Sequence, residues 1–74
     1  MHRVRAESVM KAFGQHLRDV RKSKNITQEA LAMKADIAFS SVARIEAGQI
    51  NTTISTVARL AQALEVDKDE LMKF

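Results

Sequence analysis

The sequence predicts an all-α fold, and both its composition and its apolar pattern point to that class. The chain has 74 residues with no proline and only two glycines, and aromatic residues make up 4% of it. A sheet protein needs turn residues between its strands and β-branched or aromatic runs within them, and this chain lacks both patterns. Its apolar residues instead recur three and four positions apart, as they do along one face of a helix.

Length and composition also exclude several classes of protein. A chain of 74 residues suits one domain, and a domain of this size buries only about 60% of its unfolded surface, so a partner subunit would help to stabilise it. Because the chain has no cysteine, we expect neither disulfides nor thiolate metal sites. The longest apolar run, residues 30–33, is too short for a membrane span or a signal peptide, which predicts a soluble, cytoplasmic protein.

Charge is unevenly distributed along the chain. The first 34 residues hold eight Lys or Arg against three Asp or Glu, a balance of +5, whereas residues 35–74 hold four against six, a balance of −2. A basic half is what a polyanion such as nucleic acid requires, because each phosphate contact releases counterions and adds affinity. Carboxylate pairs, metal clusters, glycine-rich phosphate loops and Ser/His/Asp sets at catalytic spacing are all missing from the sequence, so we expect neither an enzyme nor a cofactor.

The N-terminal part predicts an arm followed by a long helix. Residues 1–7 show no helical pattern and carry Arg3 and Arg5, which predicts a flexible, solvated arm. The alternative is an arm that reaches DNA, because basic N-terminal arms enter minor grooves in some DNA-binding folds. Ser8 is a suitable N-cap for the first helix. His16 on this helix has no second residue at metal-ligand spacing and is assigned no role. The apolar stripe of the helix predicts core positions at Met10, Phe13, Leu17 and Val20.

The central part predicts two short helices joined by a tight turn. Thr27 is a good N-cap for a helix over residues 28–34, and Asp36 is the residue best able to adopt the left-handed conformation of a turn. A third helix then runs from about residue 38 to residue 47 and stops at the glycine that follows it. The sequence therefore predicts a helix-turn-helix over residues 27–48.

The third helix has one apolar face and one face of polar or small residues. On a helical wheel Val42 and Ile45 face inward. Ser40, Ala43 and Arg44 face outward, and they carry little bulk apart from one guanidinium. Such a helix can approach another surface closely, and a DNA major groove about 12 Å wide admits one helix. The alternative that this pattern leaves open is a solvated face of a small helical bundle.

The C-terminal part predicts two more helices. Thr53 is a natural N-cap for a helix over residues 54–64, and Asp67 and Glu70 have capping-box spacing at the start of a last short helix. The apolar stripe of the longer helix comprises Val57, Leu60, Ala61 and Leu64. The apolar residues that follow need cover, either from the core or from a partner subunit. We predict a dimer interface formed by Leu71, Met72 and Phe74.

An ordered set of residues, at matching spacing, resembles the pattern of one DNA-binding family. The set comprises Leu17 with Arg18 and Arg21, Ile26 to Glu29, Leu31 and Ala32, Val42, Arg44 to Glu46, Gly48, and Leu60 to Leu64. From about residue 13 to residue 71 the chain resembles the Cro/repressor-type (XRE-like) helix-turn-helix family. The resemblance implies a compact five-helix bundle of the lambda-repressor-like DNA-binding type, which here forms a domain of residues 8–74.

The resemblance also implies roles for particular residues. The base-reading residues of the third helix are implied to be Ser40, Arg44, Phe39 and Ala43. Arg44 is the best candidate among them, because a guanidinium can bind guanine through two parallel hydrogen bonds. The residues implied to contact the DNA backbone are Thr27, Gln28, Gln49, Asn51, Thr52 and Thr53. Arg21 and Glu46 match a structural pair between the first and third helices, where an unpaired inward carboxylate would be costly.

Three functions from different classes fit these residues. The favoured one is a bacterial or phage transcriptional regulator, a repressor that inserts the helix over residues 38–47 into the major groove of a palindromic operator as a homodimer. The second is an antitoxin that binds its own operator and also a toxin protein, since the run from Asn51 to Ile54 resembles that of HipB-type antitoxins. The third is a helical protein-interaction module without DNA binding. A filter-binding assay with random duplex would distinguish it from the two DNA-binding functions.

Overall fold

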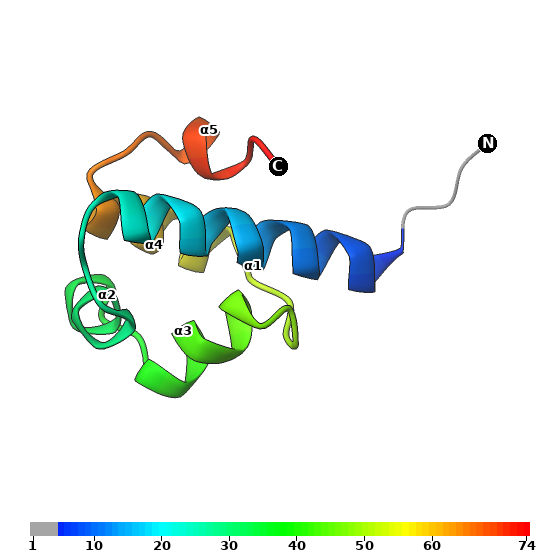
Figure 1. Ribbon diagram of the computed structural model, residues 1–74, viewed down its shortest axis with the longest axis horizontal. Coiled ribbons are helices and arrows are strands. Elements are labelled where there is room, and N and C mark those ends of the chain that lie inside the picture. The colour runs from blue at the N-terminus through cyan, green and yellow to red at the C-terminus, as the bar shows by residue number, and fades with distance from the viewer. Residues whose placement is uncertain (1–4) are drawn as a thin grey trace.

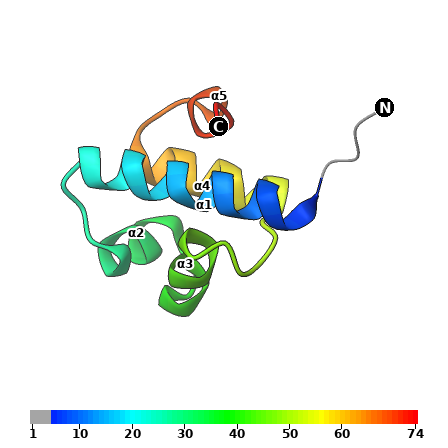
Figure 2. The ribbon, with the colours of Figure 1, turned by 45° about the vertical axis from the view of Figure 1, so that its right-hand side comes forward.

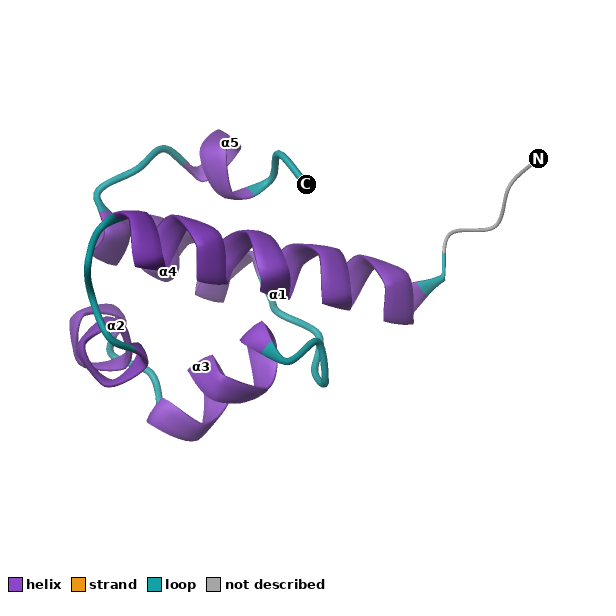
Figure 3. Ribbon diagram, viewed as in Figure 1, coloured by secondary structure: helices purple, strands orange, loops and turns teal. Residues whose placement is uncertain are grey.

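The computed structural model describes residues 5–74, which form five helices connected by short loops (Figure 1). The helices are α1 (Ala6–Ser23), α2 (Gln28–Ala35), α3 (Phe39–Glu46), α4 (Ile54–Leu64) and α5 (Lys68–Leu71). Residues 1–4, which include Arg3 of the predicted arm, lie outside the described residues. The described part of the chain contains no strand (Figure 3), so the prediction of five helices and an all-α fold is confirmed.

Helix α1 is the longest element, and the other helices pack around it. α2 and α3 lie together on one side of α1, whereas α5 lies on the opposite side (Figures 1 and 2). α3 contacts both α1 and α2, α2 contacts α4, and α4 contacts α5. The helix-turn-helix pair α2–α3 therefore rests on α1 and α4, and its outer side faces away from them. Among residues 5–74, none of the helices is both long and apolar enough to cross a membrane.

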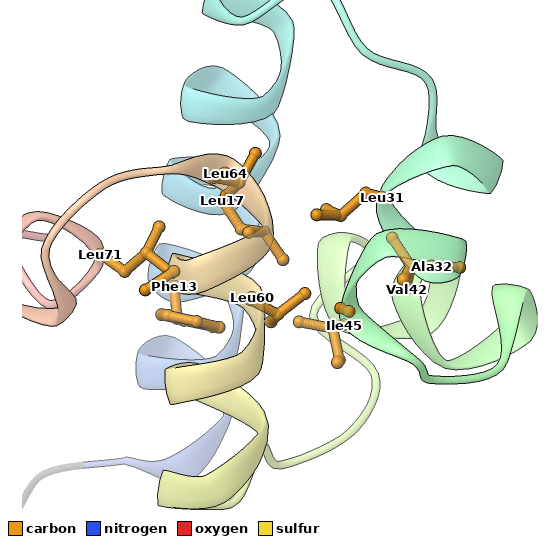
Figure 4. Close-up of a cluster of buried hydrophobic side chains, with 11 residues drawn as sticks. Phe13, Leu17, Leu31, Ala32, Val42, Ile45, Leu60, Leu64 and Leu71 are labelled. Atoms are coloured by element: carbon orange, nitrogen blue, oxygen red, sulfur yellow. The ribbon is translucent and has the colours of Figure 1, made fainter.

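All five helices contribute to one hydrophobic core (Figure 4). One side chain from each helix is completely inaccessible to water, at 0% exposure: Leu17, Leu31, Val42, Leu60 and Leu71. The burial of Leu71 corrects a prediction, because a side chain with no accessible surface cannot form a dimer interface. Leu71 instead anchors α5, which is only four residues long, against the core of its own chain.

Helix α1 begins earlier than predicted. It includes Ala6 and Glu7 of the predicted arm, so the prediction of Ser8 as N-cap was wrong. Alanine and glutamate favour helix, and a carboxylate in the first turn complements the helix dipole. These preferences extend the helix even though Arg5, the residue at the N-cap position, makes no capping hydrogen bond with its side chain.

The other helix starts show which capping predictions hold. The Thr27 hydroxyl accepts a hydrogen bond from the N–H of Ala30 at 3.0 Å, and the Thr53 hydroxyl accepts one from Thr56 at 3.1 Å. These two predicted N-caps are confirmed. Asp67 occupies the N-cap position of α5, but its side chain makes no capping hydrogen bond, so the predicted capping box is absent.

Gly14 allows α1 and α3 to approach each other closely. A Cβ atom at this position would lie 2.3 Å from the carbonyl oxygen of Ile45 and 2.8 Å from that of Glu46. Both oxygens belong to the backbone, so they cannot rotate away. We expect Gly14→Ala to lower the free energy of unfolding by about 1 to 3 kcal/mol, despite the better helix propensity of alanine. Urea denaturation measures this change.

The matched control for this prediction is Ser8→Ala, which also introduces alanine into α1 but at an exposed position. The free energy of unfolding of the control variant should lie within about 0.5 kcal/mol of that of the unmodified protein. Equal stability of the two variants would contradict the close approach of α1 and α3 at Gly14.

His16 joins α1 to the end of α5. Its Nε2 atom lies 2.6 Å from the carbonyl oxygen of Glu70, a residue 54 positions away in the sequence. An imidazole N–H can donate to this carbonyl. His16 was assigned no role from the sequence because only the folded chain brings α5 to α1.

Candidate nucleic-acid interface

Helix α3 is held by its inner face, and its outer face is open. Val42 and Ile45 are buried in the core, at 0% and 2% exposure. The four side chains that the resemblance implied as base readers all lie away from the core: Phe39, Ser40 and Arg44 are exposed, and Ala43 is half-buried. The structure therefore brings these four residues together on the outward side of α3.

Arg44 combines a fixed backbone with a free side chain. Its carbonyl oxygen accepts a hydrogen bond from the N–H of Gln49 at 2.9 Å, where the chain leaves α3. Its guanidinium is exposed and makes no hydrogen bond or ion pair to any of residues 5–74. Arg44 is the single basic residue of α3, so it is the only long cationic donor on the outward face.

The predicted pair of Arg21 and Glu46 is present and joins α1 to α3. The Nε and Nη2 atoms of Arg21 donate to the two carboxylate oxygens of Glu46 at 2.7 and 3.0 Å, and Nη1 donates to the carbonyl of Ile26 at 2.8 Å. The Arg21 and Glu46 side chains are only 10% and 3% exposed. This two-pronged contact satisfies both charges inside the fold and fixes the C-terminal end of α3.

Gln28 is a third member of this cluster, which the sequence did not reveal. Its side-chain Nε2 donates to Glu46 at 3.0 Å, so part of the amide that was expected to contact DNA is engaged inside the protein. In the first turn of α2 the Thr27 hydroxyl already accepts the N–H of Ala30. The N–H groups of Gln28 and Glu29 remain, because the first residues of a helix have no intrahelical partners for them. Gln28 thus links the start of α2 to the end of α3 and still offers donors.

The residues predicted to contact the DNA backbone form two groups. Thr27 and Gln28 lie at the start of α2, and the others lie in the loop between α3 and α4. In that loop Gln49 and Asn51 are exposed and Thr52 is half-buried. Thr53 donates its hydroxyl to Thr56 at 3.0 Å while it caps α4, so its donor is already used within the chain.

The turn between α2 and α3 is fixed from outside the motif. Asp36 ends α2 with φ 56° and ψ 49°, the left-handed conformation that the sequence predicted. Nη1 of Arg59 in α4 donates to the carbonyl of Asp36 at 3.1 Å. Sequence reasoning missed Arg59 because its contact joins residues 23 positions apart.

Phe39 begins α3 beside an apolar hollow. Its side chain is 50% exposed and lines this hollow together with Met33 of α2, which is 79% exposed. Phe39 is therefore outside the core, at the edge of the outward face and next to α2.

The C-terminal residues predicted to form a dimer interface separate into two environments. Leu71 lies in the core, whereas Met72 and Phe74 are 55% and 48% exposed. The Phe74 ring packs edge-on against Phe13, with centroids 5.6 Å apart. Met72 and Phe74 line a small hollow of about 110 Å³ whose other apolar lining residues are Val9, Met10, Phe13, Ile50 and Val57. This surface is hereafter called the C-terminal apolar hollow. Ile54, which is 88% exposed at the start of α4, lies in the sequence between two of its lining residues, Thr52 and Val57.

Comparison with known families and sequences shows the family to which the chain belongs. The helix-turn-helix family model HTH_3 matches residues 17–71. The control protein C.BamHI of Bacillus amyloliquefaciens is 35% identical over 63 residues, which cover 84% of this chain and 78% of that protein. The HTH-type transcriptional regulator RghRB of Bacillus subtilis (strain 168) is 34% identical over 64 residues, which cover 85% of this chain and 46% of RghRB.

Solved structures show the same fold. The restriction-modification controller protein C.AhdI from Aeromonas hydrophila superposes with a TM-score of 0.85 at 36% identity, covering 86% of this chain and 97% of that one. The restriction-modification controller protein C.Esp1396I superposes with a TM-score of 0.81 at 25% identity, covering 88% and 83%. The predicted lambda-repressor-like bundle is thereby confirmed. The chain belongs to the HTH_3 helix-turn-helix family of DNA-binding transcription regulators, a non-enzymatic family, and is homologous to the restriction-modification controller proteins.

Proposed function

We propose that this protein recognises a specific operator by inserting α3 into the major groove of double-stranded DNA. One observation carries the proposal: α3 is anchored through Val42 and Ile45, while its outward face joins small residues to the unpaired guanidinium of Arg44. Because Ser40 and Ala43 are small, the helix can approach base edges within a groove about 12 Å wide.

The two groups of polar residues beside α3 suit contacts with the DNA backbone. The start of α2 offers free backbone N–H groups and the Thr27 hydroxyl, and helix N-termini favour phosphate. The loop after α3 offers the exposed side chains of Gln49 and Asn51. Such contacts set the register of α3 in the groove, whereas base contacts supply the sequence preference.

The test of this function is the base preference of Arg44. If its guanidinium binds guanine through two hydrogen bonds, Arg44→Ala should cost about 1 to 3 kcal/mol of binding free energy on the preferred site. Discrimination at one base pair should relax at the same time, and Arg44→Lys should restore only part of the affinity. Binding isotherms on the preferred site and on its single-base variants measure these changes.

Lys34→Ala is the matched control, because Lys34 is an exposed cation at the end of α2 and lies outside α3. It should leave the order of preference among the site variants unchanged. Equal losses on every site variant after Arg44→Ala would assign Arg44 to phosphate contact and remove it from the base-reading residues.

We further propose that two copies of the chain bind a palindromic operator as a homodimer, through the surface around the C-terminal apolar hollow. The hollow is apolar, and the exposed Ile54 lies in the sequence between two of its lining residues, Thr52 and Val57. In a two-fold interface the same patch is used on both subunits, so a projection from one copy meets a hollow on the other. The exposed apolar side chains of Met72 and Phe74 would then be covered reciprocally.

Ile54→Asp should weaken this dimer at least about tenfold, because it removes apolar burial from both subunits and adds two charges to the interface. Ile54 is the first residue of α4, where an acidic side chain favours the helix, so the monomer should keep its fold. Equilibrium sedimentation measures the association. Met33→Asp, at a position on α2 that is 79% exposed, should leave association unchanged. Equal weakening of the dimer by both variants would argue against this interface.

The regulatory outcome that we propose is repression, since a dimer on an operator that overlaps a promoter would occupy the groove that other proteins need. The matched controller proteins are named for restriction-modification systems, so we propose promoters of such genes as targets. These names favour a regulator over an antitoxin. Operators selected from random duplexes, placed before a reporter gene, should lower expression when the protein is present, and a rise would show activation instead.

A further inference from the structure

We infer that α1 carries a second contact surface for the DNA backbone, formed by Lys11, Arg18 and Lys22. This surface, hereafter the α1 basic row, rests on the proposed DNA binding and extends it beyond α2, α3 and the loop that follows them. All three side chains are exposed. Their ligand would be the phosphates of a DNA duplex that is already held by α3.

The spacing of the three residues places them on one face of α1. At 3.6 residues per turn, residues that are seven and four positions apart lie within about 40° of one another around a helix. The row spans about 16 Å along α1 at 1.5 Å per residue. Leu17, which is buried at 0% exposure, points into the core from a different side of the helix.

The Lys11 end of the row lies against the end of α3. A Cβ atom on Gly48 would be 2.7 Å from Cγ of Lys11 and 2.9 Å from its Cα. Gly48 leads directly into the loop that holds Gln49 and Asn51, two of the residues proposed to contact the DNA backbone. Lys11 therefore lies beside the group of proposed backbone contacts in the loop after α3.

The Lys22 end of the row lies beside the other group, at the start of α2. Lys22 and Arg18 flank Arg21, whose guanidinium binds Glu46, and Glu46 in turn accepts a hydrogen bond from Gln28 at the start of α2. The α1 basic row thus runs from one group of proposed backbone contacts to the other. A strand of DNA that touches both groups passes alongside this part of α1.

The three cations of the row differ from Arg21, which lies between Arg18 and Lys22 in the sequence, because Arg21 has an ion-pair partner within the protein. Among residues 5–74, ion pairs form only between Arg21 and Glu46 and between Lys73 and Glu70. Lys11, Arg18 and Lys22 are therefore cations without an internal anion. DNA presents about one charge per 3.4 Å of axis on each strand, so a row of this length faces several phosphates.

The test removes two lysines from the row and compares them with two lysines elsewhere. The plot of log K against log salt concentration has a negative slope. Lys11→Gln with Lys22→Gln should reduce the magnitude of this slope by about 1.8 per bound subunit, since each lost contact removes about 0.9. Affinity for the preferred operator and for random duplex should fall by the same factor, and the base preference should stay unchanged. Lys68→Gln with Lys73→Gln, on or next to α5 on the opposite side of α1, is the matched control and should leave the slope unchanged.

The charge-preserving variant Lys11→Arg with Lys22→Arg should keep the full salt slope, which separates loss of charge from any effect on the fold. An unchanged slope after the glutamine substitutions, or an equal change in the α5 control, would overturn the inference. A changed base preference would also overturn it, because phosphate contacts carry no sequence information. If the unmodified protein bound no duplex at all, the proposed function itself would fail, whereas specific binding with an unaltered slope would refute the α1 basic row alone.

Discussion

Replacing Glu46 by Gln is expected to lower the free energy of unfolding by about 3 to 5 kcal/mol, the usual cost of breaking a buried ion pair by removing one charge. Both side chains are almost fully buried, at 10% exposure for Arg21 and 3% for Glu46. In the variant, one acceptor oxygen becomes an NH₂ group that faces the N–H donors of Arg21 or Gln28. Arg21 would then retain its charge without a countercharge, and urea denaturation should show the loss.

Glu70→Gln is the matched control for this substitution. Its pair with Lys73 is long, at 3.5 Å, and the two side chains are 49% and 69% exposed. An exposed pair contributes under about 1 kcal/mol, so the control variant should unfold almost like the unmodified protein. Indistinguishable denaturation curves for the two glutamine variants would show that the cluster of Arg21, Glu46 and Gln28 does not stabilise the fold.

Replacing Ile45 by Ala is expected to cost about 2 to 5 kcal/mol, because it removes a buried side chain and leaves a cavity. Ile45 is 2% exposed and lies between α3 and the rest of the core (Figure 4). Because Ile45 is one of the two side chains that anchor α3, operator affinity should fall together with stability. Thermal or urea denaturation measures the first effect, and binding isotherms below the unfolding midpoint measure the second.

Met33→Ala provides the comparison, since Met33 lies on the neighbouring helix with 79% of its surface exposed. It should change stability by no more than about 0.5 kcal/mol. If both variants lost a similar amount of unfolding free energy, the buried face of α3 would not be what anchors this helix to the core.

The fold was predictable from the sequence wherever the information is local. The hydroxyl of Thr27, the left-handed turn at Asp36 and the inward spacing of Val42 and Ile45 each depend on residues within one or two turns of helix. These features set the helix-turn-helix and the outward position of Arg44. The start of α1 was misplaced because helix ends depend on small differences among neighbouring residues.

The pairing of Arg21 with Glu46 was predictable for a different reason. The two residues are 25 positions apart, and local pattern cannot join them, but the family resemblance did. The resemblance did not predict the role of Gln28 in this cluster. It assigned Gln28 to the DNA backbone, whereas the structure also joins the Gln28 side chain to Glu46. A role carried over from a family therefore names a contact but not the other bonds that the same side chain makes.

By itself the sequence determined the all-α class, the helix-turn-helix and the residues on the outward face of α3, because periodicity and capping act over a few neighbouring residues. Only the tertiary structure decided that Leu71 belongs to the core, that Gly14 meets the backbone of α3 and that His16 holds the end of α5. Each of these depends on the packing of α1 against a distant segment. An apolar residue near a chain end looks the same in sequence whether its own core or a partner covers it, and packing alone makes the distinction.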